Sequence, residues 1–389
     1  MNEPSRAALE RCVGDPRRFL DESWGRRPLH HRSAGGFDDL LTFDQVDHIL
    51  SAMGLRTPAF RLVKDGETIP TSRYTKSVRI GSTPVTGIVD PARIFQEFND
   101  GATVVLQGVH RFWFPLARFC RELEFSLGHP TQVNAYVTPP GSQGFGVHED
   151  SHDVFVLQGF GSKHWEVFEP AASAHRSDAP AISVELQPGD SLYIPKGAPH
   201  SARTQDSVSG HLTVGVLTYT WTDVLQELFR LAEEEDTFTE RLPPGYHGDE
   251  AAFSSAVSEK LEEFGRWVEK VEPNDLAGAM VRKFLTSRPS MMTGSLEGLV
   301  AADRITDQTV LRRRPHSICH LRVAGDRLSA FLGDRELEMP ASLLPAMNLV
   351  VDQERFQVSD LSPWLDEASR LVLSRRLIRE GLLEAESVA

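Results

Sequence analysis

Residues 134–165 read NAYVTPPGSQGFGVHEDSHDVFVLQGFGSKHW, and the spacing of polar residues in this stretch decides how the chain is interpreted. His148 and Asp150 are two positions apart, so on an extended segment both side chains project to one side while Glu149 projects to the other. Two histidines and one carboxylate on a single face can bind Fe(II) and still leave coordination positions free. His148 and Asp150 are therefore candidate metal ligands that require a second histidine.

The expected third ligand is His200, which ends the segment LQPGDSLYIPKGAPH at 186–200. PGD and KGAP are turn sequences around the strand SLYIP, so the second turn delivers His200 from a neighbouring strand. A lone His-x-Asp usually marks a solvated turn, but a turn-delivered histidine about fifty residues later in an all-β segment favours a metal site. We interpret His152 and Asp153 as rim or supporting groups, and His211 as a core or supporting histidine.

Lys163 is a candidate contact for an anion. The segments HDVFVLQ, GFGS and KHWEVF predict a hairpin in which Lys163 shares a face with Trp165. Such a lysine either extends its ammonium out of a half-buried sheet or meets a carboxylate inside a pocket. In the strand VNAYV, Asn134 and Tyr136 share one face, which predicts a polar interior. Lys163, Asn134 and Tyr136 are therefore candidates for holding a small dicarboxylate beside the metal.

The composition is that of a globular chain with no membrane span. The 389 residues contain no apolar run of the length that a transmembrane helix needs, so we expect a cytoplasmic protein. The three cysteines are far apart, which predicts neither a disulfide framework nor a thiolate zinc site. A formal net charge of -14 favours a basic partner, such as a cationic protein, over nucleic acid.

The pattern of apolar and polar residues changes twice along the chain. Short apolar runs broken by Gly and Pro between about 54 and 220 predict a β-sandwich or barrel. Apolar residues then recur at three-to-four spacing after Thr222, which predicts helices. From about 290, an alternating stretch precedes a terminal helix with Leu373 and Leu377 on its core side, and this combination is typical of a winged helix.

The stretch 134–165 resembles the core of the JmjC-type Fe(II)- and 2-oxoglutarate-dependent oxygenases, specifically the ribosomal oxygenase branch. The shared features are the Asn-x-Tyr strand, the TPPGSQG turn, the His-x-Asp pair and a basic residue fifteen positions after the first ligand. The resemblance implies a double-stranded β-helix. It also implies that iron binds His148, Asp150 and His200, and that Lys163 holds 2-oxoglutarate with Asn134 and Tyr136.

The resemblance extends to the whole chain. The family's order of barrel, helical dimerisation region and winged helix matches the three regions that the apolar patterns predict. We therefore expect an α+β protein with a JmjC/cupin catalytic domain and N-terminal helical lead-in at 1–221, a helical dimerisation region at 222–289 and a winged-helix-like domain at 290–389. The helices at about 222–288 carry more apolar residues than two helices bury against each other, which predicts a homodimer.

The resemblance implies a 2-oxoglutarate-dependent dioxygenase that uses O2 to hydroxylate an arginyl or histidyl side chain of a basic ribosomal protein. Two alternatives are a tailoring hydroxylase of a small molecule or biosynthetic peptide, and a non-enzymatic, cupin-like metal-binding regulator whose winged helix binds DNA. The chain departs from the family at Glu149, where an aromatic residue is common, and at Ser151, where a second acidic residue is common. Neither departure touches the implied ligands, so the chemistry is unaffected. Both bear on substrate choice, because these positions are expected at the mouth of the pocket.

Overall fold

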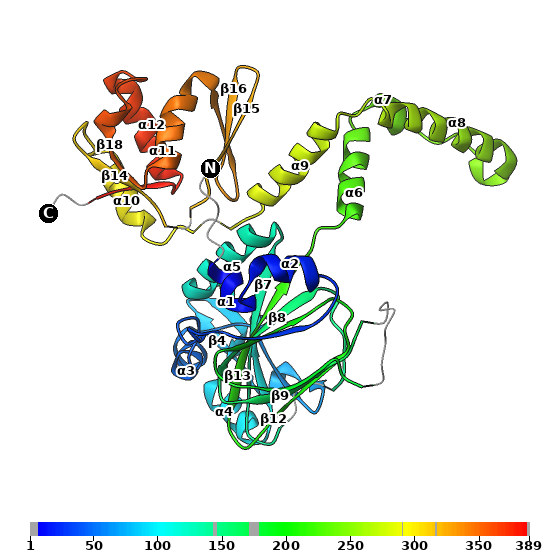
Figure 1. Ribbon diagram of the computed structural model, residues 1–389, viewed down its shortest axis with the longest axis vertical. Helices are drawn as coiled ribbons and strands as arrows, with labels where there is room; N and C mark the ends of the chain where they lie inside the picture. The colour runs from blue at the N-terminus through cyan, green and yellow to red at the C-terminus, as the bar shows by residue number, and fades with distance from the viewer. Residues whose placement is uncertain (1–6, 143–145, 171–178, 290, 316, 387–389) are drawn as a thin grey trace. The chain divides into compact units, whose positions relative to one another are not determined.

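The computed structural model describes residues 7–142, 146–170, 179–289, 291–315 and 317–386. The described residues up to Thr218 form one compact unit, and those from Tyr219 onward form a second (Figure 1). The predicted three-part division of the chain stays a prediction. Among the described helices, none has the length and apolar character needed to cross a membrane, and the cytoplasmic location also stays a prediction.

The first unit is built on two antiparallel sheets, and its core strands form the predicted double-stranded β-helix. The larger sheet has the order β1-β11-β8-β13-β7-β6-β2-β3, and the smaller has the order β10-β9-β12. The strands of the larger sheet are β1 (Leu29–Arg32), β2 (Phe60–Lys64), β3 (Glu67–Thr68), β6 (Thr103–Leu106), β7 (Thr131–Thr138), β8 (Asp153–Phe160), β11 (Asp190–Ile194) and β13 (Ser209–Val216). Those of the smaller sheet are β9 (Lys163–Val167), β10 (Ile182–Leu186) and β12 (His200–Thr204).

Apolar side chains from both sheets form a small core between them, which includes Val154 and Val156 of β8 and Trp165 and Val167 of β9. A larger core covers the other face of the larger sheet. It packs helices α1 (Ala7–Val13), α2 (Pro16–Glu22), α3 (Phe43–Ala52), α4 (Pro91–Asn99) and α5 (Phe114–Leu127) against the strands. A separate two-stranded sheet joins β4 (Thr75–Ile80) to β5 (Thr83–Val89).

The predicted hairpin of β8 and β9 is wrong. Strand β8 pairs with β11 and β13 in the larger sheet, whereas β9 pairs with β10 and β12 in the smaller one. The chain passes between the sheets at Gly161, whose φ is 60°. A Cβ atom at Gly161 would lie 1.9 Å from the carbonyl oxygen of Val208, so this corner requires glycine. The sequence signal for the turn was sound, but the turn leads to a different sheet.

The second unit begins with three main helices, α6 (Trp221–Ala232), α8 (Glu250–Val268) and α9 (Pro273–Thr286), with the short α7 (Asp236–Thr239) between the first two. Its remaining part contains two three-stranded sheets, of order β18-β14-β19 and β15-β16-β17. Its helices are α10 (Ser295–Ala302), α11 (Leu344–Asp352) and α12 (Glu367–Arg379). Its strands are β14 (Val310–Arg313), β15 (His320–Ala324), β16 (Arg327–Phe331), β17 (Glu336–Pro340), β18 (Arg355–Gln357) and β19 (Leu383–Ala385).

The terminal helix follows its prediction. Leu373 and Leu377 of α12 are buried in a core shared with α10 and α11. The helix ends at Arg379, and Gly381 follows with a φ of 77°, a left-handed conformation that glycine adopts at low cost. The winged-helix description of this region stays a prediction.

Candidate functional site

The three predicted metal ligands lie together at one end of the smaller sheet. His148 and His200 form an antiparallel β-bridge. The backbone N–H of His148 donates to the carbonyl of His200 at 3.1 Å, and the N–H of His200 donates to the carbonyl of His148 at 2.8 Å. The backbone N–H of Gly197 donates to the carbonyl of Asp150 at 3.0 Å. Main-chain hydrogen bonds therefore hold the His-x-Asp segment beside the turn that carries His200.

One ligand atom from each of His148, Asp150 and His200 lies within 4.8 Å of the other two. The Nδ1–H of His200 donates to the carbonyl of Ala198 at 2.9 Å, and that of His148 donates to the carbonyl of Gly146 at 2.9 Å. An imidazole with its proton on Nδ1 uses an unprotonated Nε2 to bind a metal ion. The Nε2 of His200 lies 3.7 Å from a carboxylate oxygen of Asp150. This donor set fits a divalent iron ion.

Burial keeps His200 in its neutral form. Its side chain is almost fully enclosed, and loss of hydration lowers its pKa below the ordinary value for histidine. The neighbouring Asp153 is buried at the start of β8, where its carboxylate accepts from the Tyr193 hydroxyl at 2.7 Å and from the Lys196 N–H at 3.2 Å. Asp153 thus anchors the turn before His200, which makes it a supporting residue and not a group at the rim.

The ligands open into a cavity of about 200 Å³ between the two sheets. Its wall includes alternating side chains of β7, a residue of β2 and further residues of both sheets. The lining residues are Arg61, Thr103, Gln132, Asn134, Tyr136, Thr138, His148, Asp150, His152, Val154, Val156, Lys163, Trp165, His200, Ala202, His211 and Thr213. The polar interior predicted from β7 is therefore present. Glu149 is exposed and lies outside this lining.

Lys163 is buried inside this cavity, with only 4% of its surface exposed. Its Nζ donates to the Thr138 hydroxyl at 3.0 Å and lies 3.4 Å from Nδ1 of His211. No carboxylate of the described residues forms an ion pair with it, and burial lowers the pKa of Lys163 to about 7. Of the two interpretations left open by the sequence, the structure supports a lysine directed into a pocket.

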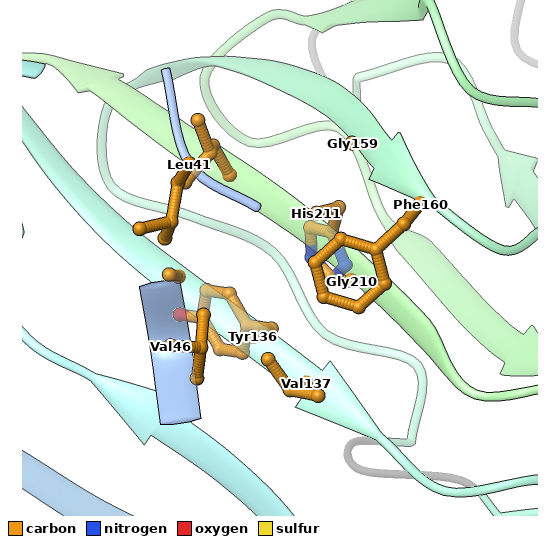
Figure 2. Close-up of a pocket in the computed structure, with 10 residues that line it drawn as sticks. Leu41, Val46, Tyr136, Val137, Gly159, Phe160, Gly210 and His211 are labelled. Carbon is orange, nitrogen blue, oxygen red and sulfur yellow. The ribbon is translucent and has the colours of Figure 1, made fainter. Parts of the chain in front are cut away.

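Asn134 and Tyr136 also line the cavity, but their side chains already have protein partners. The Asn134 carbonyl oxygen accepts from the Gly108 N–H at 3.0 Å. The Tyr136 hydroxyl is hydrogen bonded to the side chains of Asn134 and Arg61, while burial raises its pKa. Figure 2 shows Tyr136 and His211 projecting from neighbouring strands, and their rings stack at 5.0 Å with an interplanar angle of 3°.

Several lining residues were missed by the sequence analysis. Gln132 and Thr138 lie on the same face of β7 as Asn134 and Tyr136, so the alternation already used for that strand was sufficient to find them. Arg61 lies on β2, far away in sequence, and reaches the cavity because β6 pairs with both β2 and β7. No local pattern predicts this pairing. Residues 143 and 144, the last two of the TPPGSQG turn, lie outside the described residues.

Comparison with known proteins identifies the domain that contains this site. Residues 109–224 match the JmjC domain family. The chain contains a JmjC domain. Ribosomal oxygenase 1 of Gallus gallus is 32% identical to it over 282 residues, which cover 66% of this chain and 45% of that protein. The bifunctional lysine-specific demethylase and histidyl-hydroxylase NO66 of Drosophila persimilis is 27% identical over 231 residues, which cover 56% of this chain and 32% of that protein.

The JmjC domain and the regions around it also have a counterpart among solved structures. The Escherichia coli ribosomal oxygenase YcfD, solved in complex with cobalt and 2-oxoglutarate, superposes with a TM-score of 0.56 at 18% identity. The match covers 95% of this chain and 98% of YcfD. At this identity the likeness concerns the fold. The chain spans less than half of the length of the two curated relatives described above.

Proposed function

We propose that this protein is an Fe(II)- and 2-oxoglutarate-dependent dioxygenase that hydroxylates a side chain of another protein. The observation that carries the proposal is the arrangement of His148, Asp150 and His200 around a cavity that also holds the buried Lys163, which forms no ion pair with a carboxylate of the described residues. Three protein ligands leave coordination positions for a chelating acid and for O2. When bound, the iron and 2-oxoglutarate supply the oxidation chemistry, and 2-oxoglutarate leaves as succinate and CO2.

The chain's own residues bind and orient the reactants. His148, Asp150 and His200 hold the iron, and Lys163 pairs with the distal carboxylate of 2-oxoglutarate. Asn134 and Tyr136 line the same cavity and complete the contacts to the co-substrate, with Arg61 fixing the Tyr136 hydroxyl. The apolar wall, which includes Val154, Val156 and Trp165, limits the access of water.

The charges of the cavity favour a histidyl over an arginyl target. Among the described lining residues, Asp150 is the single carboxylate, and the proposed iron site uses it. The lining cations are Arg61 and Lys163, and Lys163 is engaged by the co-substrate. A guanidinium entering this cavity loses hydration without gaining a carboxylate partner, which is a large cost. A neutral imidazole instead meets groups that both donate and accept, namely the side chains of Gln132 and Thr213.

A basic ribosomal protein is the proposed partner. The similarity to proteins named ribosomal oxygenases supports it, and the formal net charge of -14 favours association with a cationic protein. The decisive experiment is mass spectrometry of ribosomal proteins from a deletion strain and its parent. A one-oxygen mass increment on a histidine that disappears in the deletion strain supports the proposal. Ribosomal proteins that are identical in the two strains overturn the ribosomal target.

We also propose that the chain forms a homodimer through α6, α8 and α9. None of the 19 residues of α8 is buried within the described structure. Large apolar side chains are exposed along this helical region, and they are Trp221, Leu225, Phe229, Leu261 and Val281. Large apolar side chains exposed in this number usually mark an interface. A second copy of the chain offers the same surface, which makes a symmetric contact self-complementary.

The DNA-binding alternative has little support from the terminal helix. Arg370 pairs with Asp307, Arg376 pairs with Glu380 at 2.7 Å, and Arg379 pairs with Asp303 at 2.8 Å. Arginines that are engaged by carboxylates do not form the free basic stripe that tracks a phosphate backbone. A tailoring hydroxylase of small molecules remains the alternative enzyme, and the mass-spectrometric comparison separates it from the ribosomal proposal.

A further inference from the structure

The ammonium of Lys163 lies at the opposite end of the smaller sheet from the metal ligands. In the β9–β12 ladder, Lys163 stands opposite Thr204, whereas His200 stands opposite Val167. These positions are four residues apart, which corresponds to about 13 Å along a strand. Lys163 therefore marks the inner end of the cavity, where a ligand bound at the metal directs its far end.

The surroundings of this ammonium consist of neutral acceptors. Thr138 of β7 accepts from Nζ, and its hydroxyl in turn lies 3.1 Å from that of Thr103 on β6. His211 of β13 presents Nδ1 at 3.4 Å. Burial, together with the charge of Lys163, holds the pKa of His211 well below its ordinary value, so this imidazole is neutral. In the tautomer that carries its proton on Nε2, Nδ1 accepts from the ammonium. Leu186 of β10 and Thr204 of β12 stand opposite Lys163 in the sheet.

The ionisable groups around the cavity can be named completely for the described residues. Tyr136 has a pKa raised by burial, so it stays neutral near pH 7, and the guanidinium of Arg61 lies beside it. The remaining ionisable lining residues are His148, Asp150, His152 and His200, which lie in or beside the metal site, and His211. None of the carboxylates in this set is within ion-pair distance of Lys163 in the described structure.

We propose that 2-oxoglutarate binding takes up one proton at Lys163, and that His211 is the positioning residue that directs the resulting ammonium toward the cavity. The inference rests on the proposed function, because it assumes that the ligand is a dicarboxylate. In the empty cavity, no anion offsets the cost of burying a charge on Lys163. A carboxylate placed beside Nζ offsets the cost of burying the charge and makes the protonated form of Lys163 the stable one.

The direction of the pH dependence follows from burial. The pKa of Lys163 is about 7 in the free protein and rises when the carboxylate is present. Well below pH 7 the lysine is already charged and binding takes up almost no proton. Above pH 7 the proton must come from solvent, so the apparent affinity falls about tenfold per pH unit between pH 8 and pH 9.

The test is isothermal titration calorimetry of 2-oxoglutarate into the full-length, Mn²⁺-loaded protein, in buffers of different ionisation enthalpy. The dependence of the measured heat on the buffer gives the number of protons taken up. At pH 8 we expect about 0.9 proton per ligand for the wild type, and about 0.1 at pH 6. Equal heats in all buffers at pH 8, with binding intact, overturn the proposal.

Lys163→Arg is the matched control, because a guanidinium keeps its charge at every accessible pH. All other ionisable groups of the cavity are unchanged in this variant. The difference in proton uptake between wild type and Lys163→Arg therefore belongs to Lys163. We expect that difference to be close to one proton at pH 8. A difference near zero assigns the proton to another group and overturns the inference.

Two substitutions test the role of His211. His211→Leu removes the acceptor, which destabilises the ammonium in the empty cavity, so uptake at pH 7 should increase from about 0.5 toward one proton. His211→Gln retains an acceptor and should stay near the wild-type value. Equal uptake in His211→Leu and wild type rules out the positioning role. Failure of wild-type protein to bind 2-oxoglutarate at any pH overturns the proposed function itself, whereas binding without proton uptake overturns only this inference.

Discussion

The backbones of His148 and His200 hydrogen bond to each other in both directions, while their imidazoles lie 4.3 Å apart between ring centroids. The main chain therefore brings the two ligands together without any contribution from their side chains. Removing an imidazole should leave this bridge intact, so the loss of metal binding can be separated from loss of the fold.

The first prediction concerns the three ligands. His148→Ala, Asp150→Ala and His200→Ala should each reduce succinate release at least about 100-fold, because two ligands do not maintain the three-ligand face. Metal content after dialysis should fall in parallel, while the circular dichroism spectrum stays that of the wild type. Full activity in any one of the three variants would exclude that residue from the metal site.

The second prediction concerns the co-substrate. Lys163→Ala should raise the KM for 2-oxoglutarate by about 10- to 150-fold, which corresponds to the loss of a hydrogen bond to a charged group. Metal binding should change little, because Lys163 touches no ligand. Initial rates measured over a range of 2-oxoglutarate concentrations provide the test, and an unchanged KM would remove Lys163 from the co-substrate site.

The third prediction concerns the corner between the two sheets. Gly161→Ala should destabilise the fold by about 3 kcal/mol or more, because the new methyl group would collide with the Val208 carbonyl. Gly128→Ala is a matched control, since Gly128 also has a positive φ, of 73°, but no atom lies within 4 Å of its Cβ position. The control should cost about 1–2 kcal/mol. Urea unfolding of both variants measures the difference, and equal losses would contradict the argument.

The fourth prediction concerns assembly. The protein should have twice the mass of the 43.3 kDa chain in light scattering at micromolar concentration. Leu261→Glu should reduce that mass, because Leu261 is 65% exposed and its substitution disturbs little within one chain. Phe264 is less suitable for this test, because its ring stacks on Phe229 at 5.5 Å within the same chain.

A control for this prediction is Leu296→Glu on α10, where the leucine is also exposed but lies outside the proposed interface. It should leave the mass unchanged. A wild-type mass that stays near that of one chain as the concentration rises would exclude the dimer.

Local sequence patterns predicted the parts of the site that depend on local geometry. Alternation along β7 placed Asn134 and Tyr136 on the cavity side, and the two-residue spacing of His148 and Asp150 placed two candidate ligands together. Alternation along β9 likewise buried Lys163 with Trp165. These successes share a cause, because each depends on the period of a single strand.

The failures concern which strands pair with each other. The short turn at Gly161 suggested that β8 and β9 are neighbours, although the two strands lie in different sheets. Arg61 and Thr103 reach the cavity through the pairing of β2 with β6 and of β6 with β7. Long-range pairing is determined by how all strands together cover the core, so the sequence of a single strand does not indicate its partner.

The two-way bridge between His148 and His200 also has a consequence for metal selection. Since the protein's own main chain holds both imidazoles in place, the site is formed before any ion arrives and does not depend on the ion for folding. A preformed site of this kind binds divalent ions in the Irving–Williams order, in which nickel, copper and zinc bind more tightly than ferrous iron. The identity of the occupying ion is then decided by the cell's supply of metals, and trace zinc in a purification would displace iron from the proposed site without unfolding the protein.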